Sequence, residues 1–547
     1  MPPVLLSELE VLVVDCQATS AAPRGRLLEI GWARVLGTIT DANACLIKDS
    51  GGEPVPPAVA RVTGITDHML RDGLQSCAAW RALTGQAATL TPQPAPTVIH
   101  FARFERPLLE SLAAGSVFPL DIVCTHEIAR RLLPDLPSRS LRAVAGYFGR
   151  AVGPLRRSAE HVEATAFVWR ELVELLEKKG VSTWIALHDW LAASQVTTKR
   201  RRRVWPMPRD MRLSLPDAPG VYRLLRTSGD VLYVGKASSL HHRVNSYFRH
   251  QHGVPGRMLE MLSQVRAISF EVTPSALEAA LVEPDEIKRH RPPYNIALTD
   301  EDRGLWFTPP DLSERSPRPS PRCRVGPFLS AEMLEQFAAL AGASRASLGG
   351  GRWAPDPAVF DEGYTQLSAA HGELSRGDLG MHAKLLHLGT RLWRSGRRDR
   401  DEDPDTAAAA DRRVRAWTPE QVRLSLERLA LRAALGRRRA RWLTRLFDAT
   451  VVWSEPGVAG ARLIVIENGE IRLRAVVDCD AVPPVPPGHQ RTITARHEAF
   501  TVARFDRLRV LGTELKRLAA AGAPVAIRFG VAPALAGGRL ASLLSWL

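Results

Sequence analysis

A segment in the middle of the chain carries side chains of the types that phosphodiester hydrolysis requires. Such hydrolysis needs a base to activate water, a cation to balance the developing charge and a carboxylate to hold a divalent metal ion. The segment contains, in this order, two phenols, an ammonium, a guanidinium, a carboxylate and an amide. They belong to Tyr222, Tyr233, Lys236, Arg243, Glu283 and Asn295. Their order and spacing predict a nuclease active site between positions 219 and 295.

A predicted β-hairpin positions the two tyrosines. Strand-like stretches at 220–225 and 231–234 flank the sequence Thr-Ser-Gly-Asp at 227–230, which is typical of a tight turn. The hairpin would place Tyr222 and Tyr233 on neighbouring strands.

A helix-like run carries the acidic residue of the segment. Glu283 is followed directly by Pro284, and a proline inside a helix removes a backbone donor and clashes with the preceding turn. We therefore expect Glu283 at a helix break or in the first turn of a new helix. Asp285 and Glu286 come next, and they either add ligand charge or are simply solvated.

The segment resembles the GIY-YIG nuclease domain of UvrC. The resemblance rests on Gly220-Val221-Tyr222, on Tyr233-Val234-Gly235-Lys236, on Arg243 and on the Tyr294-Asn295 pair that follows the acidic helix. It implies a small α/β domain, DNA as the substrate, and Mg²⁺ or Mn²⁺ as the cofactor. The polar run that follows the Tyr-Asn pair in UvrC is altered here.

The resemblance also implies a role for each side chain. Tyr222 is the general base, and it needs help because a free phenol has a pKa near ~10 and deprotonates poorly at neutral pH. Lys236 and Arg243 supply positive charge that would stabilise the phenolate, and Arg243 also steadies the phosphate. Glu283 holds one metal ion in this scheme. Tyr233 orients water or phosphate, and Asn295 braces the site.

A second group of motifs lies in the N-terminal part, where an apolar run at 11–14 is followed by Asp15. The order of motifs from Leu28-Glu29-Ile30-Gly31 through Val98-Ile99-His100 to Ala164-Thr165-Ala166 resembles the DnaQ-type proofreading exonucleases and implies an RNase H-like fold. That chemistry needs four carboxylates and a histidine around two metal ions. The matching positions hold a set that suits two hard cations poorly, namely Asp15, Gln17, Glu105, Arg156 and His161.

We therefore expect a degenerate, catalytically inactive exonuclease fold that is kept for packing or for binding nucleic acid. An arginine in the place of a metal ion can contact phosphate directly, so Arg156 favours the binding interpretation. The alternative is a slipped last motif, in which Glu160 or Glu163 supplies the missing carboxylate and exonuclease activity remains.

Composition agrees with a nucleic-acid partner without requiring one. The chain has 547 residues, with 73 Lys and Arg against 58 Asp and Glu and a formal net charge of +15. A strongly basic protein attracts polyanions, although the abundance of Ala, Arg, Pro and Gly is also what a GC-rich genome produces. The six cysteines show no zinc or disulfide spacing, and no apolar stretch is long enough to cross a bilayer, so a cytoplasmic protein is expected.

The chain divides into several predicted parts, which gives an α/β multidomain architecture. The DnaQ-like fold occupies 1–180, a helical and basic linker 181–210 and the GIY-YIG domain 211–300, and a partly disordered linker with a helical segment occupies 301–410. An α+β region of unknown role follows at 411–547. The basic linker contains a run that either contacts nucleic acid or is a solvated hinge, formed by Lys199, Arg200, Arg201, Arg202 and Arg203.

Hydrophobic periodicity predicts further elements outside the motifs. It predicts a helical segment over 170–194 and a helix over 419–446. It also predicts three strands, the last two joined by an Asn-Gly turn, at 451–453, 463–466 and 471–477. No group of carboxylates in this C-terminal region indicates a second nuclease site.

The active-site residues together with the resemblance to UvrC imply a metal-dependent DNA endonuclease that nicks a phosphodiester bond in nucleotide excision repair, with a UvrB-like or UvrA-like partner. The arrangement is similar to Cho-like repair endonucleases and to bacterial fusions of a DnaQ-like domain with a UvrC-like one. Two other interpretations stay open. One is a noncatalytic DNA-binding scaffold with two decayed nuclease domains, and the other is a 3'-5' exonuclease with an accessory endonuclease domain.

Overall fold

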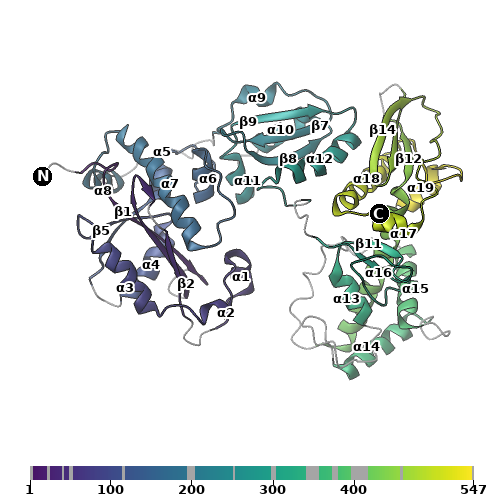
Figure 1. The fold of residues 1–547 in the computed structure, drawn as a ribbon, viewed down its shortest axis with the longest axis horizontal. Helices are drawn as coiled ribbons and strands as arrows, with labels where there is room; N and C mark the ends of the chain where they lie inside the picture. The colour runs from purple at the N-terminus through teal and green to yellow at the C-terminus, as the bar shows by residue number, and fades with distance from the viewer. Residues whose placement is uncertain are drawn as a thin grey trace. The chain divides into compact units, whose positions relative to one another are not determined.

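The structure is a computed structural model that describes residues 4–20, 25–39, 42–48, 53–113, 117–193, 204–249, 253–296, 298, 303–339, 356–372, 380–395, 417–455 and 460–544. Its elements are labelled in Figure 1. The chain forms two compact units. The first comprises Met1–Pro274 and His290–Ile296, and the second comprises Ser275–Arg289 and Ala297–Leu547.

A mixed sheet forms the centre of the N-terminal part of the first unit (Figure 1). Its strands are β1 Val11–Ala18, β2 Leu27–Leu36, β3 Thr38–Ile39, β4 Asn43–Leu46, β5 Ala95–Ile99 and β6 Leu120–Cys124. Their order is β3-β2-β1-β5-β6, and β4 also pairs with β2. β1 is antiparallel to β2 and parallel to β5. The apolar run before Asp15 is buried throughout, as in a strand that is covered on both faces.

Helices flank this sheet and form two cores with it. They are α1 Pro57–Thr63, α2 Asp67–Leu70, α3 Ser76–Ala87, α4 Ala102–Ala113, α5 Thr125–Leu132, α6 Leu141–Tyr147, α7 Ser158–Glu177 and α8 Trp184–Ala192. Val11 and Val13 pack with residues of α5 to α8, whereas Leu12 and Val14 pack with residues of α3 and α4. Because side chains alternate along β1, successive residues pack against the helices on opposite faces of the sheet. The predicted α/β fold class is confirmed.

The helical segment predicted over 170–194 contains parts of two helices in the structure. α7 ends at Glu177, and α8 begins at Trp184. Gly180 lies between them with a φ of 79°, a left-handed conformation that commonly ends a helix and favours glycine.

A three-stranded antiparallel sheet forms the other part of the first unit. Its strands are β7 Gly220–Leu225, β8 Val231–Ala237 and β9 Ala267–Val272 in the order β8-β7-β9, and its helices are α9 Arg209–Leu213, α10 Leu240–Arg249 and α11 Gly256–Leu262. The predicted hairpin is confirmed, since Arg226 N–H donates to the Asp230 carbonyl over 3.0 Å and Gly229 has a φ of 88°.

Helices dominate the first half of the second unit. The elements are α12 Ala276–His290, β10 Trp306–Thr308, β11 Val325–Phe328, α13 Ala331–Ala339, α14 Pro357–Ala370, α15 Met381–Arg394 and α16 Pro419–Leu446. The helix predicted over 419–446 is confirmed as α16. It begins with a capping box, in which the Thr418 side chain accepts from Gln421 N–H and the Gln421 side chain accepts from Thr418 N–H.

An antiparallel sheet with helices forms the rest of the second unit. The elements are β12 Ala449–Trp453, β13 Ala461–Glu467, β14 Glu470–Val477, α17 Ile493–Glu498, α18 Val502–Ala520, β15 Val525–Arg528, β16 Leu535–Ala536 and α19 Gly537–Leu544, with strand order β14-β13-β12-β15-β16. The three predicted strands are present, and Asn468 and Gly469 both have positive φ, as their hairpin turn requires.

The helix break expected at Glu283 is wrong. α12 continues through Pro284 as one helix, with Pro284 in its interior. The described residues include no helix that is long and apolar enough to cross a membrane.

Candidate nuclease site

Three tyrosines cluster in the GIY-YIG-like part of the first unit. The Tyr222 hydroxyl is hydrogen-bonded to the Tyr247 hydroxyl over 2.7 Å. The ring centroids of Tyr222, Tyr233 and Tyr247 are 6.2 to 6.3 Å apart. Tyr222 is fully buried, whereas the other two are half-buried. The two predicted strand tyrosines are therefore neighbours, and a third from α10 joins them.

A glycine leaves room for this cluster. Gly235 lies opposite Tyr222 in the strand register. A Cβ at Gly235 would lie 2.6 Å from Tyr222 Cζ and 2.9 Å from Tyr233 Cε1, and it would overlap the Tyr222 hydroxyl as well. Since ordinary van der Waals contact begins at 3.4 Å, only glycine is compatible with both rings in these positions.

Burial makes Tyr222 a weaker acid than a free tyrosine. Burial raises its pKa well above the usual range, and the nearby Tyr247 and Tyr233 hydroxyls raise it further. Arg243 acts in the opposite direction without offsetting these effects. Tyr222 is therefore a protonated phenol at neutral pH.

Arg243 brings a cation to the cluster from α10. Its guanidinium carbon lies 5.1 Å from the centroid of the Tyr247 ring, a cation–π distance. Burial lowers the pKa of Arg243, but the oxygens of Tyr247 and Tyr222 raise it by more, so the charge is secure. Tyr247 was absent from the predicted site residues. Its spacing of four from Arg243 on a helix could have indicated it, because such residues share a face.

Asn295 contacts the strand that carries Tyr233. Its side-chain carbonyl accepts from Val234 N–H over 3.0 Å, and its amide donates to the Val234 carbonyl over 2.9 Å. The amide thus pairs with β8 as a neighbouring strand would, which is the contact a bracing role requires. Lys236 is half-buried on the same strand, opposite Val221 in the register.

Glu283 is half-buried on α12, which belongs to the second unit, whereas the other five predicted residues belong to the first. Throughout the described part of the chain, no three His, Cys, Asp or Glu side chains are grouped to hold a metal ion. A single carboxylate still suits Mg²⁺, which keeps several of its waters and takes one or two protein carboxylates. Glu283 therefore fits such an ion, although it does not make a closed metal site.

The exonuclease-like centre is built around a buried aspartate. Asp15 Oδ2 accepts a hydrogen bond from Gln17 Nε2 over 2.9 Å, and Asp15 Oδ1 lies 3.2 Å from His161 Nδ1. Burial and the charge of Asp15 raise the pKa of the buried Glu105 well above its usual range. An amide, an imidazole and a carboxyl group with a raised pKa thus surround Asp15, where the resemblance expects carboxylates that bind metal.

A further buried carboxylate near this centre is already paired. Glu29, opposite Gln17 in the register, has its two oxygens 2.9 and 3.1 Å from Arg157 Nε and accepts from Ser158 N–H over 2.8 Å. This arrangement fixes the start of α7 against β2.

The two alternative carboxylates also have other partners. Glu160 Oε2 accepts from Arg156 N–H over 2.7 Å at the start of α7, and Glu163 lies 4.0 Å from Arg150. The slipped-motif alternative therefore gains no support from these contacts.

A basic pocket of about 430 Å³ lies next to this centre in the first unit. Its lining includes Arg61, Arg142, Arg156 and His161, with Glu260 of α11 as its carboxylate. Arg142 is paired with Glu260 over 3.0 Å, whereas Arg61 and Arg156 are exposed. Of the predicted centre, the structure thus groups three residues, Gln17, Glu105 and His161, around Asp15. It places Arg156 in the pocket beside His161.

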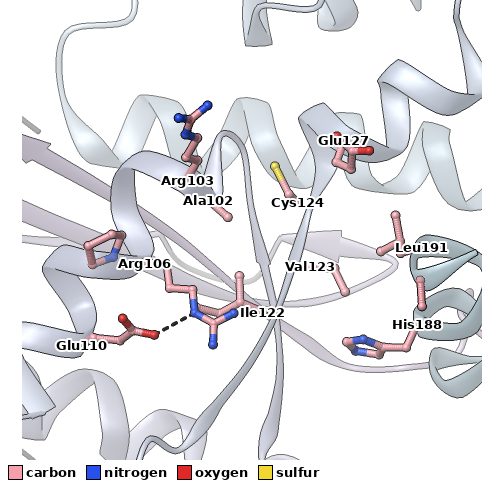
Figure 2. Close-up of a pocket in the computed structure, with 12 residues that line it drawn as sticks. Ala102, Arg103, Arg106, Glu110, Ile122, Val123, Cys124, Glu127, His188 and Leu191 are labelled. Carbon is pink, nitrogen blue, oxygen red and sulfur yellow. Dashed lines mark hydrogen bonds and ion pairs between the residues drawn. The ribbon is translucent and has the colours of Figure 1, made fainter. Parts of the chain in front are cut away.

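Another pocket, of about 510 Å³, has charges of both signs (Figure 2). Arg103 and Arg106 line it together with Glu110, Glu127 and His188. The Arg106 guanidinium is paired with Glu110 over 2.8 Å. This balance of positive and negative side chains does not favour binding of a phosphate.

The basic run formed by Lys199, Arg200, Arg201, Arg202 and Arg203 lies outside the described residues.

Comparison with known proteins finds a family match for part of the chain and several relatives. Residues 218–296 match the model of the UvrC-like GIY-YIG domain. A Mycobacterium tuberculosis (strain CDC 1551 / Oshkosh) protein, whose name provisionally assigns it exonuclease and endonuclease activity, is 32% identical over 362 residues, which cover 61% of this chain and 52% of that protein. UvrABC system protein C of Sphingopyxis alaskensis is 51% identical over 87 residues, which cover 16% of this chain and 13% of the relative.

Comparison with solved structures also finds partial likenesses. The N-terminal GIY-YIG endonuclease domain of Thermotoga maritima UvrC bound to magnesium is 31% identical, with a TM-score of 0.15, over 16% of this chain and 94% of that one. E. coli exonuclease I in complex with a dT13 oligonucleotide is 13% identical, with a TM-score of 0.28, over 40% of this chain and 48% of that one. The chain spans about half the length of the mycobacterial relative and a smaller share of UvrC. It carries a UvrC-like GIY-YIG domain together with an exonuclease-like N-terminal region.

Proposed function

We propose that this protein is a metal-dependent endonuclease that nicks DNA and acts in nucleotide excision repair. The observation that best supports it is the cluster in which Tyr222 is bonded to Tyr247 and Arg243 lies over the Tyr247 ring. Phosphodiester hydrolysis needs both a proton acceptor and a fixed cation.

In the proposed mechanism Tyr222 accepts the proton of the attacking water. Its raised pKa keeps the phenolate scarce, so the rate depends on positive charge close to the ring. Arg243 supplies fixed charge there and can hold a phosphate as a planar fork. Tyr247 fixes the Tyr222 hydroxyl through their hydrogen bond. Tyr233 orients water or phosphate.

Two further residues support these groups. Asn295 holds β8 in place through both of its bonds to Val234. Lys236 adds positive charge on the same strand.

Glu283 is the proposed ligand of a divalent metal ion, Mg²⁺ or Mn²⁺. Such an ion, when bound, polarises the phosphate and stabilises the leaving oxygen. The Thermotoga maritima UvrC domain binds magnesium as its catalytic divalent cation, which supports this choice. Nucleotide excision repair, with a UvrB-like or UvrA-like partner, is supported by the relatives named as UvrABC system proteins.

The test is nicking of supercoiled plasmid, undamaged or carrying bulky lesions, in Mg²⁺ or Mn²⁺. The wild-type protein is compared with Glu283→Gln and Asp15→Asn. Nicking that is lost in Glu283→Gln and kept in Asp15→Asn is the expected result. Wild-type protein that binds DNA without nicking it under any of these conditions would instead favour the noncatalytic scaffold.

The basic pocket favours a second candidate function, in which the exonuclease-like region binds a single nucleic-acid strand without cutting it. Arg61 and Arg156 are exposed at the pocket, and Val62 beside them is 65% exposed, which offers an apolar surface to a sugar or base. A volume of about 430 Å³ is close to the lower end of small-ligand pockets, so it suits about one nucleotide and excludes a duplex.

The test is binding of a fluorescent single-stranded oligonucleotide at several salt concentrations. Loss of two phosphate contacts in the Arg61→Ala/Arg156→Ala variant should reduce the slope of log affinity against log salt by about 1.4. The matched control is Arg103→Ala/Arg106→Ala, which removes two arginines from the mixed pocket of Figure 2 and should leave the slope unchanged. Equal effects of both variants would mean that binding is merely electrostatic.

A further inference from the structure

Pro284 weakens α12 at the residue that follows Glu283. A proline has no N–H, so the carbonyl of Ala280 loses its partner in the helix, and the ring crowds the preceding turn. The helix nevertheless runs without interruption over Ala276–His290. Because its own hydrogen-bond ladder is incomplete beside Glu283, its conformation there depends on tertiary contacts on both sides of the proline.

Apolar packing and a buried carboxylate hold the part of α12 before the proline. Leu277 and Leu281 are buried in the core formed by the C-terminal sheet and α18. Glu278 is buried, with its carboxylate 3.9 Å from Arg462 of β13 and 3.8 Å from Arg474 of β14. This half of the helix is thus attached to β14, at the edge of the C-terminal sheet, and to its neighbour β13.

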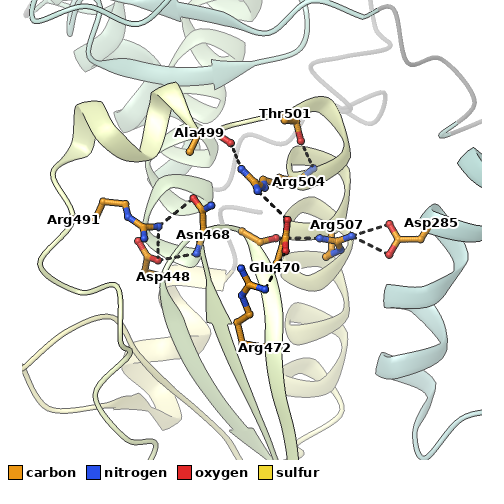
Figure 3. A network of polar contacts seen from close by, with 11 residues as sticks. Asp285, Asp448, Asn468, Glu470, Arg472, Arg491, Ala499, Thr501, Arg504 and Arg507 are labelled. Carbon is orange, nitrogen blue, oxygen red and sulfur yellow. Dashed lines mark hydrogen bonds and ion pairs between the residues drawn. The ribbon is translucent and has the colours of Figure 1, made fainter.

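Ion pairs with α18 hold the part of α12 after Glu283. Lys288 Nζ lies 2.9 Å from Oδ2 of Asp506, which is fully buried, and Arg303 lies 2.9 Å from the same oxygen. The next residue of α18, Arg507, donates to both carboxylate oxygens of Asp285 over 2.9 Å (Figure 3). Figure 3 shows Asp285 facing the guanidinium of Arg507.

The contacts therefore lie on both sides of Glu283, at positions 278, 285 and 288. We propose that the C-terminal region, residues 419–544, positions Glu283 for metal binding by holding α12 straight through Pro284. Arg507, with its partner Asp285, and Asp506 are positioning residues in this proposal, and none of them touches the substrate. The proposal rests on the proposed function, because it takes Glu283 as the metal ligand.

The test begins with Arg507→Asp in the full-length protein, which places two carboxylates opposite each other. Calorimetric titration with Mg²⁺ alone should show about threefold to tenfold weaker binding, as expected from losing an ion pair and adding repulsion. The Mg²⁺ concentration that gives half-maximal nicking should rise by the same factor. The charge-swapped variant Asp285→Arg/Arg507→Asp should restore both values to within about twofold of the wild type, because it restores the pair.

The matched control is Arg472→Asp, which makes the same charge change in the same group of contacts. Arg472 pairs with Glu470 of its own strand at 3.7 Å, so its loss should leave Mg²⁺ binding unchanged (Figure 3). Amide hydrogen exchange of α12 gives a readout that does not depend on activity. Protection of α12 should fall in Arg507→Asp, recover in the swapped variant and stay unchanged in Arg472→Asp.

Failure of this proposal is distinguishable from failure of the proposed function. If the wild type binds Mg²⁺ through Glu283 but does not nick DNA, and the swap restores affinity lost in Arg507→Asp, the positioning role stands and the endonuclease proposal fails. If Glu283 is needed for nicking but Arg507→Asp has normal Mg²⁺ affinity and normal α12 protection, the positioning role is overturned. If Arg472→Asp lost as much Mg²⁺ affinity and α12 protection as Arg507→Asp, the positioning role would also be overturned.

Discussion

Gly235→Ala tests whether the position of the Tyr222 hydroxyl controls the nicking rate. The new Cβ would lie 2.6 Å from Tyr222 Cζ, and ordinary contact requires 3.4 Å, so the ring must retreat by about 0.8 Å. Tyr222 is fully buried and bonded to Tyr247 over 2.7 Å, so this retreat also stretches or breaks that bond. A displacement near 1 Å in a catalytic group lowers the rate by about a hundredfold.

The assay is single-turnover nicking of supercoiled plasmid by protein whose melting temperature has been measured. Overpacking should also destabilise the first unit by about 1–3 kcal/mol, so the assay is run well below the melting temperature. The matched control is Gly256→Ala at the start of α11, where a Cβ meets no atom within 4 Å. That variant should nick DNA at the wild-type rate.

A double-mutant cycle shows whether the effect acts through the hydroxyl. Tyr222→Phe removes the proposed base, so adding Gly235→Ala to it should cost much less than the hundredfold lost in the wild-type background. Folded Gly235→Ala protein that nicks within about threefold of the wild type would show that the position of the hydroxyl does not control the rate, because a 1 Å displacement could not then matter.

Two substitutions and a change of pH should have effects that follow from the contacts and the pKa shifts of the site. Arg157→Ala should lower the free energy of unfolding of the first unit by about 2 kcal/mol in denaturation experiments, because the buried Glu29 would keep only its backbone donor. The single-turnover nicking rate should rise by up to about tenfold per pH unit between about pH 6.5 and 8.5, since the raised pKa of Tyr222 keeps its base form scarce. Asp15→Asn should lower the pKa of His161 in an NMR titration, because burial lowers that pKa and the bond to Asp15 raises it above 6.5.

The first of these predictions has a control variant, and each of the three has a result that would contradict it. Arg106→Ala removes an exposed pair and should cost no more than about 0.5 kcal/mol, so an equal loss would contradict the role assigned to Arg157. A rate that does not change with pH would contradict a tyrosine base. For His161, the stabilisation is complete below about pH 6.5 and is lost as the pH rises through the raised folded pKa. An unchanged His161 pKa in Asp15→Asn would show that the aspartate does not control it.

Local signals explain why the hairpin and α16 could be predicted from the sequence. The turn at Gly229 needs a positive φ, and the alternation on either side of it fixes which residues face Tyr222. α16 has Thr418 and Gln421 as a capping box and a continuous stripe of leucines. Where the signal lies within a few residues, the pattern alone decides the structure.

Tertiary contacts explain why other features could not be predicted. Pro284 predicts a helix break on local grounds, but the contacts of Leu281 and Lys288 with the C-terminal core keep α12 continuous. The partner of the Tyr222 hydroxyl lies 25 residues away on α10, and only the folded chain brings Tyr247 to it. The substitutions around Asp15 were visible in the sequence, whereas the raised pKa of Glu105 follows from burial and the charge of Asp15, which only the fold brings about.

The most direct test of the endonuclease proposal compares a covalently closed single-stranded circle with a linear strand of the same sequence, both incubated with Mg²⁺. An endonuclease cuts both, because it needs no free end. We predict that the wild-type protein and Asp15→Asn linearise the circle and that Glu283→Gln and Tyr222→Phe do not. Digestion of the linear strand alone, lost in Asp15→Asn and kept in Glu283→Gln, would contradict the proposal and would place the activity in the exonuclease-like region.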